Sequence, residues 1–228
     1  MSDMIKGIIY SISYFTILPI KIPHFEANKN FYKGVVYGLP IAGLLLGLVI
    51  VGSFLILPFE PLYKAILVSI AYLFLYGFIH LEAVADTIDG LFASLSGKNV
   101  HTIMKEPQIG AIGAIGTFCF VLLKILAIAY LLFYEQFSFV ILIFMLSRVS
   151  LLFALDLEFH KDSSFVLSLK NSYSASSFFK ILFFPFNILT KYILSKLKKQ
   201  LGFLNGDTLG FNIELQEIIL LNIAVMFC

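Results

Sequence analysis

Long apolar segments alternate with short polar ones along most of the chain, and their lengths predict membrane helices. A helix needs about 20 predominantly apolar residues to cross the hydrocarbon core of a bilayer. The segments of about this length are residues 35–57, 65–85, 110–134, 137–155 and 208–228. The first of them carries Gly43 and Gly47, and this i, i+4 spacing is typical of closely packed helices. We predict a membrane span for each segment.

Two further segments are apolar but short. Residues 5–20 form a run of about 16 residues, so an interfacial or re-entrant helix competes with a short span there. In residues 178–197 the uncharged run covers only 181–190, and we expect this segment to dip into the membrane and return. The predicted fold class is all-α: a polytopic integral membrane helical bundle of about five to seven membrane helices, including re-entrant or interfacial elements.

The amino-acid composition is that of an integral membrane protein. Of 228 residues, 60% are hydrophobic and only 13% are charged, whereas soluble domains average about 25% charged residues. We therefore expect a single membrane domain over residues 1–228, in contact with membrane lipid. The net charge of +2 gives no indication of nucleic-acid binding. Two cysteines do not indicate a disulfide framework.

The polar segments predict the orientation in the membrane. Residues 86–107 and 156–177 both contain lysines, and loops rich in lysine and arginine stay on the cytoplasmic side. If residues 178–197 dip in and return, the loop at Gly206 faces the same side as Asp86. The sequence therefore predicts that these two positions share the cytoplasmic face.

Three carboxylates form the sharpest chemical signal. On a continuous helix Glu82, Asp86 and Asp89 fall at i, i+4 and i+7, within about 60° of one another. Like charges on one stripe repel, so a cation between them explains their clustering, and Mg²⁺ held for a phosphate-bearing substrate is the simplest one. The alternative is a solvated acidic helix end. His80 lies about 200° from Glu82 around the same helix, so it is either a packing histidine or a separate substrate contact.

The sequence NGDTLG, residues 205–210, forms a second constellation. Its glycines allow a tight turn before a helix, where free N–H groups suit a phosphate. Asp207 and Glu214 are seven residues apart and share a face of that helix. The alternative role for Asp207 is that of a helix N-cap.

Cations within or beside the predicted spans are further candidates. Lys124 and Arg148 lie inside predicted spans. Placing a charged side chain in the membrane costs free energy, so such a residue is treated as a candidate for a functional role. Each either pairs with the carboxylates or holds a substrate phosphate. Lys105 precedes the glycine-rich start of the span 110–134 and is either a phosphate contact or a solvated lysine.

Three blocks, in this order, resemble the signature of a known family. They are HLEAVADTIDG, IMKEPQIGAIG and GDTLGFNIELQE, and they resemble the cobalamin synthase family, also called adenosylcobinamide-GDP ribazoletransferases. The early FTILPIKIP, the segment with Pro40, Gly43 and Gly47, and the positions of Lys124 and Arg148 resemble the family too. The resemblance covers nearly the whole chain and is weakest over residues 156–199.

The resemblance implies a membrane enzyme that joins adenosylcobinamide-GDP to α-ribazole or α-ribazole 5′-phosphate. The products would be adenosylcobalamin or its 5′-phosphate, together with GMP, and Mg²⁺ would be required. It also implies a multi-pass protein of the bacterial or archaeal cytoplasmic (inner) membrane, with its active site facing the cytoplasm. A homo-oligomer is compatible with the sequence.

Residue roles follow from the motif positions that match. The expected catalytic residues are Asp86, Asp89, Glu82 and Glu214. The expected Mg²⁺ ligands are Asp86, Asp89, Glu82 and Asp207. The expected substrate-binding residues are His80, Lys105, Lys124, Arg148, Gly206 and Thr208. As the base for the attacking hydroxyl, Glu214 and Glu82 are equal candidates.

Departures from the family pattern affect single positions. The chain has Glu82-Ala83 where the family commonly has Asp-Gly, which keeps the charge and lengthens its reach. Gln108 stands at a position that is usually basic, and Ile17 replaces a frequent arginine. Phosphate contacts are therefore not expected at those two positions, and the acidic cluster is unaffected.

Two other functional classes compete with this interpretation. An ion-coupled secondary transporter also uses intramembrane carboxylates and broken helices. Against it, the carboxylates lie at the end of a predicted span and the chain shows no inverted repeat. Alcohol phosphotransferases and prenyltransferases also use aspartate-rich helices, and the spacing of Asp86 and Asp89 alone does not exclude them.

Overall fold

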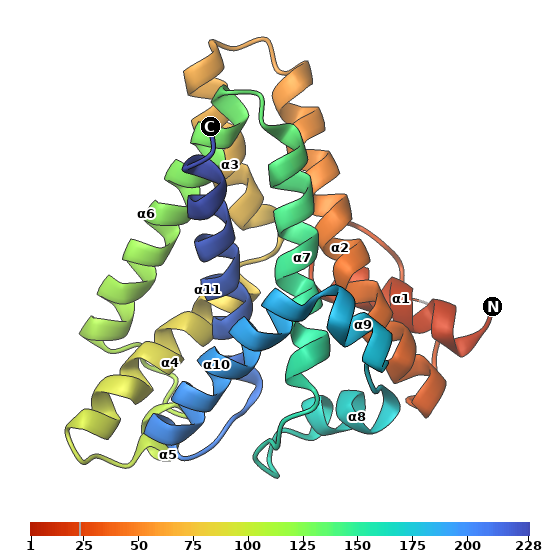
Figure 1. The fold of residues 1–228 in the computed structure, drawn as a ribbon, viewed down its shortest axis with the longest axis vertical. Helices are drawn as coiled ribbons and strands as arrows, with labels where there is room; N and C mark the ends of the chain where they lie inside the picture. Colours follow the sequence, from red (N-terminus) through yellow and green to blue (C-terminus); the bar gives the residue numbers. More distant parts are fainter. Residues whose placement is uncertain (23) are drawn as a thin grey trace. The chain divides into compact units, whose positions relative to one another are not determined.

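The computed structural model describes residues 1–22 and 24–228 and is helical throughout, with no strand in that part of the chain (Figure 1). Pro23, the last residue of FTILPIKIP, lies outside the described residues. The helices are α1 (Asp3–Tyr14), α2 (Lys29–Ile56), α3 (Pro61–Leu75), α4 (Ile79–Leu95), α5 (Val100–Ile103), α6 (Ala111–Phe133), α7 (Phe137–Ala154), α8 (Ser164–Ser172), α9 (Ser177–Leu182), α10 (Phe184–Leu201) and α11 (Gly206–Val225).

Within the described residues, four helices are long and apolar enough to cross a membrane: α2, α6, α7 and α11. They coincide within a few residues with four of the predicted spans, except that α2 begins earlier, at Lys29. Uninterrupted apolar sequence of this length has few alternatives to a helix in lipid, because only a helix satisfies all its own backbone groups. The chain is therefore a multi-pass membrane protein, as its composition predicts.

The predicted span 65–85 is wrong as a single helix. The chain breaks between α3 and α4, and the two helices meet the criteria for a span only as one bent pair. Gly77 and Phe78 both take positive φ, at 67° and 56°. The N–H of Gly77 donates to the carbonyl of Phe74, and the N–H of Phe78 donates to that of Leu73. This is a Schellman termination, and it ends α3 before the carboxylate stripe begins.

The two ambiguous segments are not among the candidate spans. Helix α1 has only 12 residues, which rise about 18 Å and fall short of the hydrocarbon core. Helix α10 has 18 residues, but its four lysines make it too polar. Both findings agree with elements that do not cross the membrane, whereas the re-entrant path of residues 178–197 stays a prediction.

The chain divides into two compact units. The first contains Met1–Phe78, Val121–Val149 and Gln216–Cys228, and the second contains Ile79–Phe120 and Ser150–Leu215. Helices α6, α7 and α11 each contribute residues to both units. The single membrane domain inferred from the chain's size stays a prediction, because a division into compact units does not by itself define domains.

In the first unit, glycines set the approach of α2 to α7. A Cβ atom on Gly43 would collide with the carbonyl oxygen of Phe144, and one on Gly47 would lie 2.7 Å from the Cα of Ile141. The i, i+4 glycine pair therefore packs a neighbouring helix closely, as the sequence predicts.

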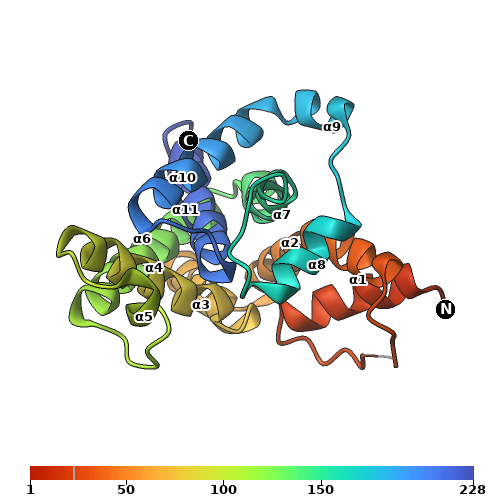
Figure 2. The ribbon, with the colours of Figure 1, turned by 90° about the horizontal axis from the view of Figure 1, so that it is seen from below.

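In the second unit, α4 packs against α5 and α10, and α4 and α5 lie side by side in both views (Figure 1, Figure 2). A Cβ atom on Gly90 of α4 would lie 2.9 Å from the Sδ of Met104, which follows α5. This close packing fixes the face of α4 that carries the carboxylates.

Candidate active site

The carboxylate stripe is present on one short helix. Glu82, Asp86 and Asp89 all belong to α4, which begins at Ile79. The sequence places them at the end of a membrane helix, but the break at Gly77 puts Glu82 in the first turn of a new helix instead. Glu82 is exposed, and Asp86 and Asp89 are half-buried. The helix N-terminus favours the negative charge of Glu82 through the helix dipole.

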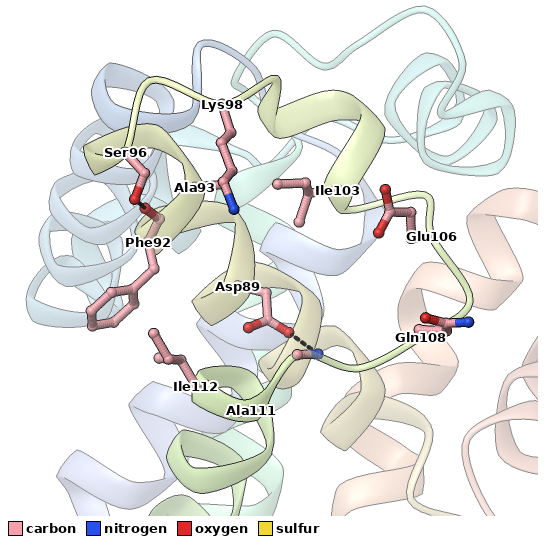
Figure 3. Close-up of a pocket in the computed structure, with 11 residues that line it drawn as sticks. Asp89, Phe92, Ala93, Ser96, Lys98, Ile103, Glu106, Gln108, Ala111 and Ile112 are labelled. Atoms are coloured by element: carbon pink, nitrogen blue, oxygen red, sulfur yellow. Dashed lines mark hydrogen bonds between the residues drawn. The ribbon is translucent and has the colours of Figure 1, made fainter.

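Asp89 connects two of the sequence blocks that resemble the family. Its Oδ2 accepts a hydrogen bond of 2.7 Å from the N–H of Gly110 (Figure 3). Its Oδ1 accepts one of 2.8 Å from the N–H of Gly113. These donors lie at the start of α6, so Asp89 caps that helix from α4. A Cβ atom on Gly110 would lie 2.6 Å from Oδ1 of Asp89, and one on Gly113 would collide with the same carboxylate. Glycine is therefore required where the carboxylate sits on the helix end.

The start of α11 holds Asp207 through its neighbour Asn205. The side-chain oxygen of Asn205 accepts a hydrogen bond from the N–H of Thr208, and the Thr208 hydroxyl accepts one from the N–H of Asn205. Asn205 is therefore the capping residue, and this leaves Asp207 for another role. Its Oδ2 accepts a hydrogen bond of 2.7 Å from Nδ2 of Asn205. Gly206, the first residue of α11, is exposed.

Helix α11 runs antiparallel to α4 where the two meet. A Cβ atom on Gly210 would lie 2.7 Å from the Cβ of Ala83. On one side of this crossing Glu214 contacts His80, and on the other the charge of Asp207 acts on Asp86. The order of contacts along α11 is thus the reverse of that along α4.

Four carboxylates come together at this crossing. The negative charges of Asp207, Glu82 and Asp89 all act on the Asp86 carboxyl, and that of Glu82 acts on Asp207. The two acidic clusters that the sequence separates by more than 100 residues therefore lie within electrostatic range of each other, but in the described residues no three of these carboxylates bring their oxygens within 4.8 Å of one another. Mutually repelling carboxylates with oxygen donors only are what a hard divalent cation such as Mg²⁺ binds.

A cavity of about 350 Å³ lies beside Asp89 (Figure 3). Its lining includes Lys98, Glu106, Gln108 and the N-terminal residues Gly110 and Ala111. This volume lies in the range of about 300–1,000 Å³ that is usual for small-molecule sites. Asp89 already accepts from two N–H groups at this helix start, so Lys98 is the group in the lining that suits an anionic ligand.

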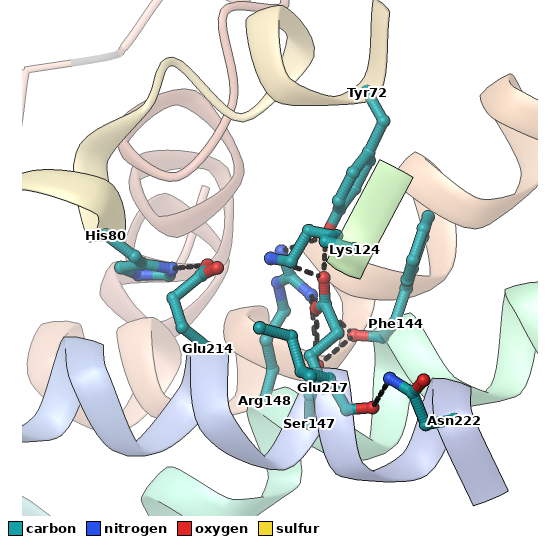
Figure 4. Close-up of polar contacts among 10 residues, drawn as sticks. Tyr72, His80, Lys124, Phe144, Ser147, Arg148, Glu214, Glu217 and Asn222 are labelled. Atoms are coloured by element: carbon teal, nitrogen blue, oxygen red, sulfur yellow. Dashed lines mark hydrogen bonds and ion pairs between the residues drawn. The ribbon is translucent and has the colours of Figure 1, made fainter. Parts of the chain in front are cut away.

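His80 and Glu214 form a buried pair. Nδ1 of His80 lies 3.4 Å from Oε1 of Glu214, and the two side chains are 7% and 1% exposed (Figure 4). His80 is therefore directed away from the carboxylate stripe, as its angular position predicts, and toward α11. The roles of His80 as a substrate contact and of Glu214 as a base stay predictions.

Lys105 is an exposed lysine with a carboxylate partner. Its Nζ donates a hydrogen bond of 2.9 Å to Oδ2 of Asp162. This hydrogen bond lowers the pKa of Asp162 below its ordinary value, so the carboxylate is ionised at neutral pH. A phosphate contact by Lys105 stays a prediction.

Lys124 and Arg148 share a carboxylate that the sequence analysis did not single out. Nζ of Lys124 lies 2.9 Å from Oε1 of Glu217, and Nη1 of Arg148 lies 3.0 Å from Oε2 (Figure 4). The hydroxyl of Tyr72 donates to Oε1, and that of Ser147 donates to Oε2. Of these side chains, the three charged ones are at most 1% exposed. The sequence does contain a feature that could have identified Glu217. It is a negatively charged residue inside the predicted span 208–228, whereas Lys124 and Arg148 are positively charged residues inside two other spans.

This network is a buried ion cluster within the first unit. The Lys124 ammonium also lies 5.2 Å and 5.6 Å from the ring centroids of Tyr76 and Tyr72, distances typical of cation–π contacts. Arg148 donates further to the carbonyl of Phe144. The predicted pairing of the two intramembrane cations with a carboxylate is thus present, and a phosphate contact by either of them stays a prediction.

Comparison with known proteins decides the family. The family model described as cobalamin-5-phosphate synthase matches residues 7–225. The chain belongs to this family. A relative from Treponema denticola is 32% identical over 95% of this chain and 96% of its own length, and one from Alkaliphilus oremlandii is 29% identical over 93% of each. Both are named adenosylcobinamide-GDP ribazoletransferase. No solved structure matches this chain.

Family membership confirms the resemblance that the three sequence blocks indicate. Relatives of nearly equal length carry the name of a transferase, so the chain is a member of a transferase family. All three blocks lie within the matched residues, and Glu82 and Asp86 of the first block act electrostatically with Asp207 of the third. The family therefore favours an enzyme over a secondary transporter.

Proposed function

We propose that this protein transfers the phosphoryl-linked corrinoid of adenosylcobinamide-GDP to α-ribazole or its 5′-phosphate. The products are adenosylcobalamin or its 5′-phosphate, together with GMP. The observation that carries the proposal is the crossing of α4 and α11, which brings Glu82, Asp86, Asp89 and Asp207 within electrostatic range of one another. The family to which the chain belongs supports the identity of the substrates.

The donor set fits Mg²⁺. All four side chains offer carboxylate oxygens, and Asp89 keeps a second lone pair on each oxygen after capping α6. A magnesium ion bound here supplies charge neutralisation for the pyrophosphate as GMP leaves. In the proposal Asp86 and Asp89 are the main ligands, and Glu82 and Asp207 assist.

The chain's own residues position the substrate and take a proton. The attacking ribazole hydroxyl must reach a base directly, and exposure favours Glu82 over the buried Glu214 for this step. Glu214 and His80 then act as a positioning pair that holds α11 against α4. Lys105 is exposed, so in the proposal it releases its ion-pair partner Asp162 and binds a phosphate group of the substrate instead.

Gly206 and Thr208 shape the start of α11. Gly206 leaves the start of α11 open for a phosphate group, and the Thr208 hydroxyl completes the cap with Asn205. Lys124 and Arg148 are engaged by Glu217, and we infer that they hold the helices rather than the substrate.

The proposed location is the cytoplasmic membrane of a prokaryote, with the carboxylates facing the cytoplasm. Lysines in the segments before α6 and after α7 support this orientation through the positive-inside rule. The substrates are large and charged, so an enzyme of this kind needs its site on the side where they are made.

One experiment tests the activity and the orientation together. Sealed inside-out and right-side-out membrane vesicles containing the protein are incubated with adenosylcobinamide-GDP, α-ribazole 5′-phosphate and Mg²⁺. We expect a cobalamin product and GMP from inside-out vesicles, complete loss with a chelator, and no product from intact right-side-out vesicles. Absence of product from both, with folded protein, contradicts the activity. Equal product from both contradicts the orientation alone.

A further inference from the structure

Two histidines and an aspartate converge outside the carboxylate cluster. His101 lies on α5, and His160 and Asp162 lie in the segment between α7 and α8. Nε2 of His101 is 3.5 Å from Oδ2 of Asp162, and Nδ1 of His160 is 3.6 Å from the same oxygen. One ligand atom from each residue lies within 4.8 Å of the other two.

The fold holds these side chains in place from several directions. The N–H of His160 donates to the carbonyl of Leu204 at 2.7 Å. The ring centroids of His101 and His160 are 4.9 Å apart, and the ring of Phe203 packs edge-on against both at 5.4 and 5.6 Å. The rings are thus fixed before any ligand binds, which lowers the entropic cost of binding.

The spacing suits a tetrahedral metal. Bonds of about 2.0–2.1 Å at tetrahedral angles place neighbouring ligand atoms about 3.3 Å apart. The two histidine–aspartate distances, 3.5 and 3.6 Å, are close to this value, and all three ligand atoms lie within 4.8 Å of one another. The N–H of Asp162 also donates to Nδ1 of His160 at 3.3 Å. That bond requires Nδ1 to be the unprotonated nitrogen and uses its one lone pair, so a metal at Nδ1 would replace this long hydrogen bond.

The donor types separate this cluster from the carboxylates on α4. Imidazole nitrogens with one carboxylate favour zinc and neighbouring transition metals, whereas oxygen-only donors favour Mg²⁺. A cavity of about 230 Å³ adjoins the cluster; its lining includes His101, His160 and Asp162, and it extends to Lys105, Gly206 and Asp207. Asp162 is 46% exposed, so solvent reaches the site and supplies a fourth ligand.

The ammonium group of Lys105 would compete with a metal ion for the carboxylate of Asp162. Its Nζ lies 2.9 Å from Oδ2 of Asp162, the oxygen nearest to both imidazoles. A metal at the cluster and the Lys105 ammonium would use the same oxygen, so each disfavours the other. Removal of this ammonium should therefore strengthen metal binding.

We propose that His101, His160 and Asp162 form a binding site for a divalent transition metal, with Zn²⁺ as the natural choice and water as the fourth ligand. The site uses none of the proposed Mg²⁺ ligands. It goes beyond the proposed function and does not depend on it.

The test measures metal binding directly on the full-length protein in detergent, after removal of any histidine tag. Co²⁺ is titrated and followed by the visible absorption bands of four-coordinate Co²⁺, and Zn²⁺ is then used to displace it. We expect one equivalent of Co²⁺ to bind and Zn²⁺ to abolish the bands. His101→Ala and His160→Ala should each weaken binding by about 100-fold, since even an outer-shell partner is worth roughly 10–100-fold.

Two variants make the test specific. His24→Ala, at an exposed histidine elsewhere in the chain, should leave the titration unchanged, and Lys105→Gln should tighten binding several-fold. Thermal unfolding without metal checks that each variant is folded. Absence of the bands in the wild type, unchanged binding in both His101→Ala and His160→Ala, or weaker binding in Lys105→Gln would overturn the proposal.

Discussion

At the scale of single residues, Asp89 and Asp86 differ in how the fold uses them. Asp89 accepts two backbone hydrogen bonds at the start of α6, so it is a structural residue as well as a proposed ligand. Asp86 is surrounded by the charges of Glu82, Asp89 and Asp207. Its negative charge costs stability without a cation, which is the usual signature of a functional residue.

This difference makes Asp86→Asn the sharpest test of the carboxylate cluster. We expect turnover to fall by at least about 100-fold, because the amide loses the charge of a metal ligand and even outer-shell changes cost roughly 10–100-fold. The unfolding midpoint in Mg²⁺-free buffer should not fall, because the substitution relieves like-charge repulsion. Initial rates and thermal unfolding in detergent measure the two effects.

A matched control is Glu60→Gln, which removes one carboxylate at an exposed position before α3. It should leave both the rate and the unfolding midpoint unchanged. Wild-type turnover by Asp86→Asn would contradict the role of the cluster.

At the scale of helices, glycines decide which elements approach. Gly113 lets the Asp89 carboxylate sit on α6, and Gly210 lets α11 meet α4 at Ala83. Both lie in sequence blocks that resemble the family, IMKEPQIGAIG and GDTLGFNIELQE. Their function is therefore to build the site by close packing rather than to contact the substrate.

Gly113→Ala tests this packing. The new Cβ would collide with Oδ2 of Asp89 and lie 2.8 Å from the carbonyl oxygen of Ala85. We expect a loss of roughly 1–3 kcal/mol in the free energy of unfolding, the usual cost of overpacking. Gly52→Ala on α2 is the control, since nothing lies within 4 Å of its added Cβ. It should be neutral or stabilise the helix by about 0.5–1 kcal/mol. Equal effects of the two substitutions in detergent unfolding would contradict the packing role.

At the scale of the whole molecule, the chain places charges in its apolar helices and neutralises them internally. Lys124, Arg148 and Glu217 come from α6, α7 and α11, and all three are essentially without solvent exposure. A buried charge is tolerated only when it is paired and hydrogen-bonded. The cluster therefore ties three candidate spans to one another through groups that lipid cannot solvate.

Glu217→Gln should destabilise the protein by about 3–5 kcal/mol, because two buried cations lose the carboxylate that they share. The comparison is Glu214→Gln, which removes the carboxylate beside His80. That loss should be smaller, since histidine can become neutral whereas arginine cannot. Thermal unfolding of the purified variants measures both effects, and a wild-type midpoint for Glu217→Gln would show that the ion cluster is dispensable.

The amino-acid sequence by itself determined the features that depend on local pattern. Apolar runs of span length became α2, α6, α7 and α11, and the i, i+4, i+7 spacing put Glu82, Asp86 and Asp89 on one helix. The ordered blocks were enough to indicate the family. These features need only neighbouring residues, because helix period and hydrophobic length are properties of a continuous segment.

Only the tertiary structure decided which distant residues meet. Glu217 rather than Glu214 pairs with Arg148, 69 residues away, although both acids lie on α11. Likewise, Gly77 and Phe78 end α3 early, and Asp89 caps a helix that begins 22 residues later. Glu214 and Glu217 are about one helical turn apart along α11, so each meets a different part of the surrounding helices. Which partner lies there depends on how the helices pack. Sequence spacing carries no direct information on that packing.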